Sequence, residues 1–255
     1  MAETSDSAIE FRRIAFRLTP DRPLLSDLNF VIRRGETVML LGRSGSGKTT
    51  CLKLMNRLLV PTSGDLLVEN KLSQEWDPIQ LRRRMGYAIQ DVGLFPHYTV
   101  WQNVALVPKL EKWQRQRINS RVEEVLQLVG LPSREFADRY PTQLSGGQRQ
   151  RVGLARALAA EPPILLMDEP FGALDPVTRA EMQTEFKKLQ QKLGKTIIFV
   201  THDVGEALLL GDRIALMEAG RLRSIDTPRE FLQSSDAVAQ VFVNVFRAAQ
   251  QSPQN

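Results

Sequence analysis

Two stretches near the start of the chain alternate between apolar and polar residues. The first covers residues 9–18, and the second covers residues 24–32, where Leu28, Phe30 and Ile32 occupy every other position. A period of two places such side chains on one face of a strand, so we predict a small antiparallel sheet. A further strand is expected over residues 65–68, after the turn-forming run Pro61-Thr62-Ser63-Gly64.

Other apolar runs are short, do not alternate and are bounded by helix-breaking residues; they cover residues 37–41, 164–167 and 196–200. Uninterrupted apolar runs of this length are typical of strands buried on both faces of a mostly parallel sheet. Residues 213–217 and 221–225 flank Glu218-Ala219-Gly220, which predicts a β-hairpin.

Helical periodicity dominates residues 81–160. Within this block, apolar side chains over residues 118–129 share one face of a helix that should end at Gly130. Helices are also expected over residues 50–59 and 149–160. A helical block that interrupts strands of an α/β core predicts a second, inserted lobe.

The end of the chain predicts two more helices. Thr227-Pro228-Arg229-Glu230 has capping-box spacing with proline at the first helical position. The final helix carries an apolar stripe, for which packing on its own domain is favoured over docking of a partner: Val238, Val241, Phe242, Val245 and Phe246. Residues 250–255 are expected to be disordered.

Composition narrows the class of protein. The chain has 255 residues, 42% hydrophobic and 25% charged. No apolar run approaches the ~20 residues that a membrane-spanning helix needs, and residues 1–7 lack a signal-peptide core. We expect a cytoplasmic protein, with any membrane role exerted through a partner. Its single cysteine, Cys51, allows no internal disulfide and is expected to pack as a small buried residue.

The net charge of +5 does not by itself indicate nucleic-acid binding. Arg82-Arg83-Arg84 is the densest basic run, and it suits a solvated helix face or a partner contact at least as well as a nucleic-acid surface. No nucleic-acid-binding signature accompanies it, so no nucleic-acid partner is expected.

A glycine-rich run directly follows the apolar segment over residues 37–41. It reads Gly42-Arg43-Ser44-Gly45-Ser46-Gly47-Lys48-Thr49 and matches G-x-x-x-x-G-K-[ST]. In this motif, backbone N–H groups surround a β-phosphate, the Lys48 ammonium reaches the β- and γ-phosphate oxygens, and the Thr49 hydroxyl is placed to bind Mg²⁺. The helix that follows from Thr50 adds its positive end. The motif therefore predicts a site for a nucleoside triphosphate.

Two acids follow a later apolar run. Asp168 ends the run over residues 164–167, and Glu169 comes next. A strand ending there would place both carboxylates at the carboxyl edge of the sheet, where α/β proteins bind ligands. Asp168 is suited to holding Mg²⁺, and Glu169 to acting as general base on the attacking water.

The segment Leu144-Ser145-Gly146-Gly147-Gln148 resembles the signature motif of ATP-binding-cassette (ABC) ATPases. Three further matches occur in the family's order: Gln90 as its glutamine loop, Ala173-Leu174-Asp175 after the acidic strand, and His202 as its switch histidine. The resemblance covers about residues 9–232. His97 matches no family motif and is expected to be structural or partner-facing.

The resemblance implies the fold and its boundaries. We expect an α/β fold with a P-loop NTPase core, a mostly parallel sheet, an N-terminal antiparallel β subdomain and an inserted α-helical subdomain. The whole chain would be one nucleotide-binding domain. Its RecA-like core with the antiparallel strands would cover about residues 8–90 and 161–232, its helical subdomain about 91–160 and its C-terminal helix about 236–248.

The resemblance also implies a head-to-tail dimer of two copies. ATP on Lys48 of one copy would be completed by Ser145, Gly147 and the amino end of the signature helix of the other. By analogy, His202 contacts the γ-phosphate, Gln90 senses Mg²⁺ and water, and Asp175 joins the two sites. Gly146 and Gln148 belong to the same signature loop.

One position departs from the family pattern. The family usually stacks adenine on an aromatic side chain where this chain has Leu18, and we therefore expect weaker ATP affinity or reduced base selectivity. Phe16 or a residue near Pro20 is an alternative stacking partner.

The segments at residues 85–97 and 104–108 are similar to importers of glycine betaine and related quaternary amines. This implies an ATPase subunit on the inner face of the cell membrane, with permease partners and, indirectly, an external solute-binding protein. The alternatives are the ATPase of an exporter or of an importer for another solute, and a soluble ABC ATPase acting on nucleic acid or the ribosome.

Overall fold

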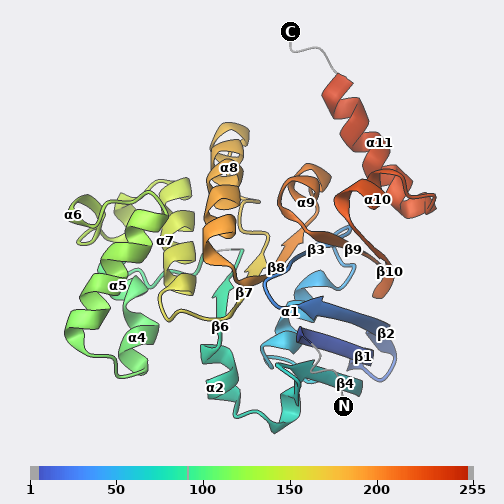
Figure 1. Cartoon of the computed structure of the whole chain (residues 1–255), viewed down its shortest axis with the longest axis horizontal. Helices are drawn as coiled ribbons and strands as arrows, with labels where there is room; N and C mark the ends of the chain where they lie inside the picture. The colour runs from blue at the N-terminus through green and yellow to red at the C-terminus, as the bar shows by residue number, and fades with distance from the viewer. Residues whose placement is uncertain (1–5, 91, 252–255) are drawn as a thin grey trace. The chain divides into compact units, whose positions relative to one another are not determined.

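The computed structural model describes residues 6–90 and 92–251, which fall into two compact units (Figure 1). Unit 1 contains the described residues up to Trp76 and those from Thr196 onward, and unit 2 contains Asp77–Lys195. The domain boundaries expected from the sequence stay a prediction.

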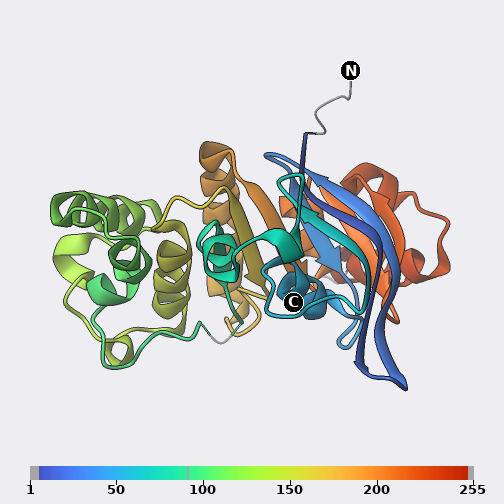
Figure 2. The same cartoon turned by 90° about the horizontal axis from the view of Figure 1, so that it is seen from below.

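Unit 1 opens with a four-stranded antiparallel sheet in the order β2-β1-β4-β5. Its first two strands form the long, curved ribbon drawn in blue in Figure 2. Phe11 lies opposite Phe30 across this pair, and their rings stack with centroids 4.4 Å apart. The predicted N-terminal strands are thus confirmed, with these bounds: β1 Ser7–Thr19, β2 Arg22–Arg33, β4 Ser63–Val68 and β5 Lys71–Leu72, followed by the 3₁₀ turn η1 Ser73–Glu75.

The second sheet of unit 1 has the strand order β10-β9-β3-β8. Strand β3 is parallel to both neighbours, whereas β9 and β10 form the predicted antiparallel hairpin. Every residue of β3 and β8 is buried, as uninterrupted apolar runs require. The bounds are β3 Thr37–Leu41, β8 Thr196–Thr201, β9 Arg213–Glu218 and β10 Arg221–Asp226.

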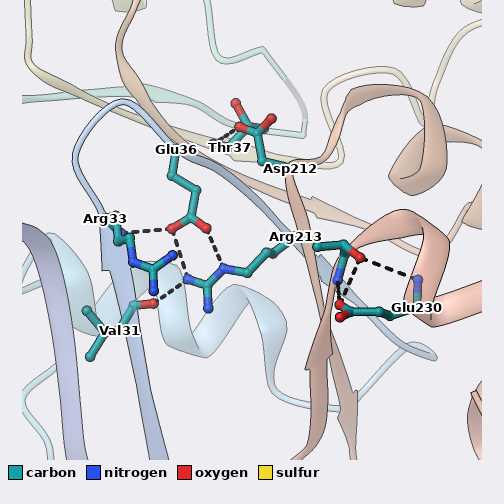
Figure 3. Close-up of polar contacts among 8 residues, drawn as sticks. Val31, Arg33, Glu36, Thr37, Asp212, Arg213 and Glu230 are labelled. Carbon is teal, nitrogen blue, oxygen red and sulfur yellow. Dashed lines mark hydrogen bonds and ion pairs between the residues drawn. The ribbon is translucent and has the colours of Figure 1, made fainter.

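A polar cluster joins the two sheets of unit 1 (Figure 3). The Arg213 guanidinium pairs with the Glu36 carboxylate and donates to the Val31 carbonyl oxygen of β2 at 2.7 Å. Glu36 also accepts from the backbone N–H of Arg33 at 2.8 Å. The Asp212 carboxylate accepts from the backbone N–H of Thr37 at 2.8 Å. These bonds hold β3 and β9 against the end of β2.

The helices of unit 1 are α1 Lys48–Met55, α9 Val204–Leu210, α10 Pro228–Leu232 and α11 Ala237–Gln251. The capping box of α10 is confirmed. The helix expected over residues 50–59 was misplaced at both ends: α1 starts two residues earlier, on the glycine turn, and ends before Asn56 because Arg57 adopts φ 55°.

Helix α11 differs from its prediction in which face it buries. Ala239 and Val243 are fully buried, whereas Val241 and Val245 are 45% and 64% exposed. Helix α11 packs against α9 and α10, and Val238, Phe242 and Phe246 are half-buried. Only part of the predicted stripe therefore packs on its own domain. Gln250 and Gln251 are helical, which corrects the expected disorder there, and residues 252–255 lie outside the described residues.

Unit 2 pairs two parallel strands, β6 Met85–Ala88 and β7 Ile164–Asp168, with a set of helices. The sequence reading missed β6, which is too short for a periodicity. At Gly86 a Cβ atom would lie 2.2 Å from the Ala157 carbonyl oxygen of helix α7 (Gly146–Leu158), so only glycine lets this strand approach that helix. Helix α5 (Arg115–Leu128) ends just before Gly130, as predicted, and Gly130 adopts a left-handed φ of 70°. The helices are α2 Pro78–Arg83, α3 Val100–Val104, α4 Leu106–Leu110, α5 Arg115–Leu128, α6 Ser133–Phe136, η2 Pro141–Gln143, α7 Gly146–Leu158 and α8 Pro176–Leu193.

The predicted mixed α/β class is confirmed: parallel strands, a separate antiparallel sheet and helices share the chain. Among the helices that the structure describes, none is both long and apolar enough to cross a bilayer.

Candidate functional site

The glycine-rich run links β3 to α1 as a tight loop. Gly47 ends it in the left-handed region, with φ 100°. A Cβ atom on Gly42 would lie 2.3 Å from the Met217 carbonyl oxygen of β9. Because both positions exclude a larger residue, the loop owes its shape to its glycines, as the motif predicts.

Lys48 lies buried at the start of α1, with 4% of its surface exposed. Its Nζ donates to the carbonyl oxygens of Gly42 and Arg43 at 2.7 and 2.9 Å. Helix α1 has no acid in its first turn, and its N-cap, Gly47, has no side chain to satisfy the first N–H groups. A buried ammonium beside an open helix amino end favours an anion.

Two other buried side chains lie near the loop. Among the described residues, the buried Ser46 hydroxyl has no hydrogen-bond partner, as expected of a group awaiting a ligand. The Cys51 thiol is fully buried, which raises its pKa to about 12 and confirms the packing role predicted for this residue.

His202 lies at the same edge of the sheet as the loop. Strands β3 and β8 run parallel with Leu41 opposite Thr201, so Gly42 and His202 are the next residues along adjacent strands. The Asp203 carboxylate caps α9 by accepting from the N–H groups of Gly205 and Glu206 at 2.7 and 3.2 Å. His202, one residue before this cap, is exposed on the turn between β8 and α9.

The two acids lie at the end of β7 in unit 2. Asp168 is 6% exposed, and Glu169 adopts φ 45°, which turns the chain sharply after the strand. The Tyr87 hydroxyl of β6 donates to Asp168 Oδ2 at 3.4 Å. Burial raises the pKa of Tyr87, and the Asp168 charge raises it further, so Tyr87 stays a protonated donor. Sequence reasoning missed Tyr87, because no motif singles it out.

The signature segment forms the start of α7. Ser145 is the N-cap: its hydroxyl accepts from the Gln148 N–H at 3.2 Å, and the Gln148 side chain accepts from the Ser145 N–H at 2.9 Å. Gly146 and Gly147 form the first turn, so this helix begins three residues earlier than predicted. Ser145 and Gly146 are exposed and present the helix amino end to solvent.

Two more predicted site residues lie in unit 2. Asp175 caps α8 by accepting from the Thr178 N–H at 3.1 Å. Hydrogen bonding from the Thr178 side chain, and then from its N–H, lowers the pKa of the exposed Asp175. Gln90 is exposed just after β6, and its carbonyl oxygen accepts from the Gln150 amide at 3.4 Å. Unit 1 therefore brings the loop and His202 together, and unit 2 carries Gln90, the signature segment, the acids and Asp175.

The predicted adenine position is on β1 in unit 1. Leu18 is 57% exposed, whereas Phe16 is only 8% exposed and belongs to the core. Phe16 is therefore not available to stack a base.

A glycine loop that leads from a buried parallel strand into a helix, with its lysine buried over loop carbonyls, defines a P-loop protein of the α/β class. The model of the family described as ABC transporter matches residues 25–172. The chain belongs to this family, which confirms the resemblance seen in the sequence.

Curated relatives are similar over most of this chain. The choline transport ATP-binding protein OpuBA of Bacillus subtilis is 49% identical over 229 residues, which cover 89% of this chain and 60% of that protein. The glycine betaine uptake system ATP-binding protein YehX of Escherichia coli is 48% identical over 236 residues, covering 92% and 76%. The chain thus spans about 60% of the length of the first of these relatives.

Solved structures share the fold. CbiO1 of Clostridium perfringens, part of the ABC transporter complex cbiONQ, superposes with a TM-score of 0.83 at 30% identity, covering 96% of this chain and 98% of that one. The ATP-binding cassette MJ0796, solved as a dimer bound to ADP and Pi, gives 0.76 at 35% identity, covering 87% and 99%.

Proposed function

We propose that this chain is the ATP-hydrolysing subunit of an ABC transporter that imports glycine betaine or choline-type osmoprotectants. The observation that carries the ATPase proposal is the buried Lys48 ammonium inside the glycine loop, beside an open helix amino end. The transport names of OpuBA and YehX support the substrate class. The solute would contact the permease rather than this chain.

Each predicted site residue has a proposed role in binding or hydrolysing the nucleotide. The N–H groups of residues 42–50 and the Lys48 ammonium would hold the phosphates. Glu169 would accept the proton of the attacking water, and His202 would contact the γ-phosphate at the shared sheet edge. Catalysis of this kind rests on positioning and charge stabilisation.

The donor set suits Mg²⁺. Among the described residues, no cluster of three or more His, Cys, Asp or Glu side chains forms a metal cage. Mg²⁺ in nucleotide sites is held by one or two carboxylates together with substrate phosphates, so the residues fit. Thr49, Asp168 and Gln90 would hold the ion, which neutralises charge developing on the β- and γ-phosphate oxygens when bound.

The active form is proposed to be a head-to-tail dimer of two copies. Ser145, Gly146 and Asp175 are exposed in the described chain, as surfaces that complete a neighbour's site must be. The dimeric structures of MJ0796 support this arrangement. Each copy would supply Lys48 to one site and Ser145 to the other.

Mixing two inactive variants tests this arrangement. Lys48→Ala removes the phosphate contact, and Ser145→Asp keeps the helix cap but repels the γ-phosphate. Each variant alone should be inactive. In an equal mixture about half of the dimers are mixed, and each mixed dimer has one site without either change, so activity should return to at most about a quarter of the wild-type level. Ser145→Asn, which caps without charge, is the control. No recovery on mixing, or full activity in a verified monomer, would overturn the dimer proposal.

An apolar groove in unit 2 is the proposed contact for a permease, which would hold the chain on the inner face of the membrane. The groove has a volume of about 650 Å³. Its wall includes Phe95, Leu106 and Leu110, with Arg83 and Arg156 among the lining residues. The Arg156 guanidinium donates to the Gly93 carbonyl oxygen at 2.7 Å, which ties α7 to the loop before α3. An external solute-binding protein would contact the permease, and no nucleic acid is required.

A further inference from the structure

Tyr87 and Asp168 share one face of the parallel β6–β7 pair. Tyr87 lies opposite Leu166, and Ala88 lies opposite Met167. Side chains two residues apart on a strand point to the same face, so Asp168 follows Leu166 on the face that carries Tyr87. The Tyr87 side chain therefore needs to reach only one pleat along the neighbouring strand to meet the carboxylate.

The contact places a neutral donor on a nearly buried carboxylate. The Tyr87 hydroxyl lies 3.4 Å from Asp168 Oδ2, longer than the usual range for an O–H···O hydrogen bond. Asp168 has only 6% of its surface exposed, so water contributes little to holding its side chain in one orientation. A donor fixed on β6 supplies part of that restraint.

We propose that Tyr87 is a positioning residue that orients the Asp168 carboxylate for Mg²⁺. This inference rests on the metal role proposed for Asp168 above. It adds a residue that is outside the phosphate loop, the signature segment and the acid pair. Tyr87 also lines the apolar groove, so a segment seated there would contact the residue that orients Asp168.

Metal binding can be measured without turnover. Mn²⁺ is titrated by electron paramagnetic resonance into the full chain loaded with a non-hydrolysable ATP analogue. Tyr87→Phe removes the hydroxyl and keeps the ring, and Asp168→Asn removes the carboxylate charge. Tyr98→Phe is the matched control, because it deletes the same group from a side chain that is 40% exposed elsewhere in unit 2.

Tyr87→Phe should weaken Mn²⁺ binding about tenfold, which is the lower end of the roughly 10- to 100-fold loss seen when a residue that orients a metal ligand is changed. Tyr98→Phe should leave Mn²⁺ binding unchanged. Affinity for the analogue in EDTA should be the same in both variants. Hydrolysis by Tyr87→Phe should recover at high Mg²⁺, which a merely misfolded site would not allow.

The outcomes separate the two proposals. If Asp168→Asn weakens Mn²⁺ binding and Tyr87→Phe does not, the positioning role of Tyr87 is overturned while the metal role of Asp168 stands. If Asp168→Asn leaves Mn²⁺ binding unchanged, the metal role is overturned, and the inference about Tyr87 with it.

Discussion

The Lys48 ammonium donates to the carbonyl oxygen of Gly42, 2.7 Å away, at the opposite end of the phosphate loop. Lys48 begins α1 and Gly42 follows β3, so this bond joins the two ends of the loop. A bound triphosphate would offer this buried cation a stronger, charged acceptor.

Lys48→Ala should therefore weaken ATP binding about 10- to 100-fold, the range for losing a hydrogen bond to a charged group. Titration with a fluorescent ATP analogue measures this. Lys53→Ala changes an exposed lysine one turn further along α1 and is the control. An unchanged dissociation constant for Lys48→Ala would contradict the assigned role.

Glu169→Gln should retain ATP binding and lower turnover by about 10²- to 10⁴-fold, because the amide keeps the shape of the side chain but cannot accept the proton from water. Phosphate release at saturating ATP is the measurement. Glu181→Gln, on an exposed part of α8, should behave as wild type. Unimpaired hydrolysis in Glu169→Gln would refute Glu169 as the base.

Leu18→Tyr should strengthen ATP binding by about 1–3 kcal/mol, because it restores an aromatic face for the adenine at an exposed position of β1. Titration of wild type and variant with ATP and GTP checks both affinity and base selectivity. Leu58→Tyr, at a position 51% exposed, controls for added aromatic surface. A strong preference of the wild type for ATP over GTP would count against the proposed consequence of Leu18.

Leu110→Glu should abolish membrane association and leave the ATPase rate of the purified chain unchanged, because it places a charge in the apolar groove away from the nucleotide-binding residues. Co-sedimentation with membranes of expressing cells measures the first effect. Leu209→Glu places a charge on an exposed leucine of α9 and is the control; this variant should still co-sediment with membranes. If Leu110→Glu still associates with membranes, the groove is not the permease contact.

The Glu36–Arg213 pair makes stability depend on pH. Burial opposes ionisation of Glu36, but the hydrogen bonds from Arg213 and from the Arg33 N–H outweigh it, so the net effect lowers the pKa of Glu36. A lowered folded-state pKa stabilises the protein above the unfolded-state pKa of about 4.3, and this contribution is lost as pH falls through the folded-state pKa.

Glu36→Gln should therefore lower the free energy of unfolding at pH 7 by about 1–2 kcal/mol and flatten its decline in acid. Urea denaturation from pH 7 down to about pH 3 tests both effects. Glu75→Gln, at an exposed position in η1, is the control. An unchanged acid profile in Glu36→Gln would contradict the pairing.

Local patterns predicted several elements well, for physical reasons that act within short segments. Strand β3 and the loop after it follow from an apolar run and from glycines that must adopt φ values closed to other residues. The capping box at Thr227 acts within one helical turn. Strand β6 escaped prediction because four residues carry no detectable period, and its approach to α7 depends on Gly86 and on a distant carbonyl.

The sequence by itself determined the α/β class, the phosphate loop and the order of the family motifs, because each depends on residues that are neighbours along the chain. Only the tertiary structure decided that His202 follows a strand in register with β3, that α11 buries Ala239 and Val243, and that Tyr87 meets Asp168. These relations join residues far apart in the chain, and their side chains meet only after the strands have paired and the helices have packed.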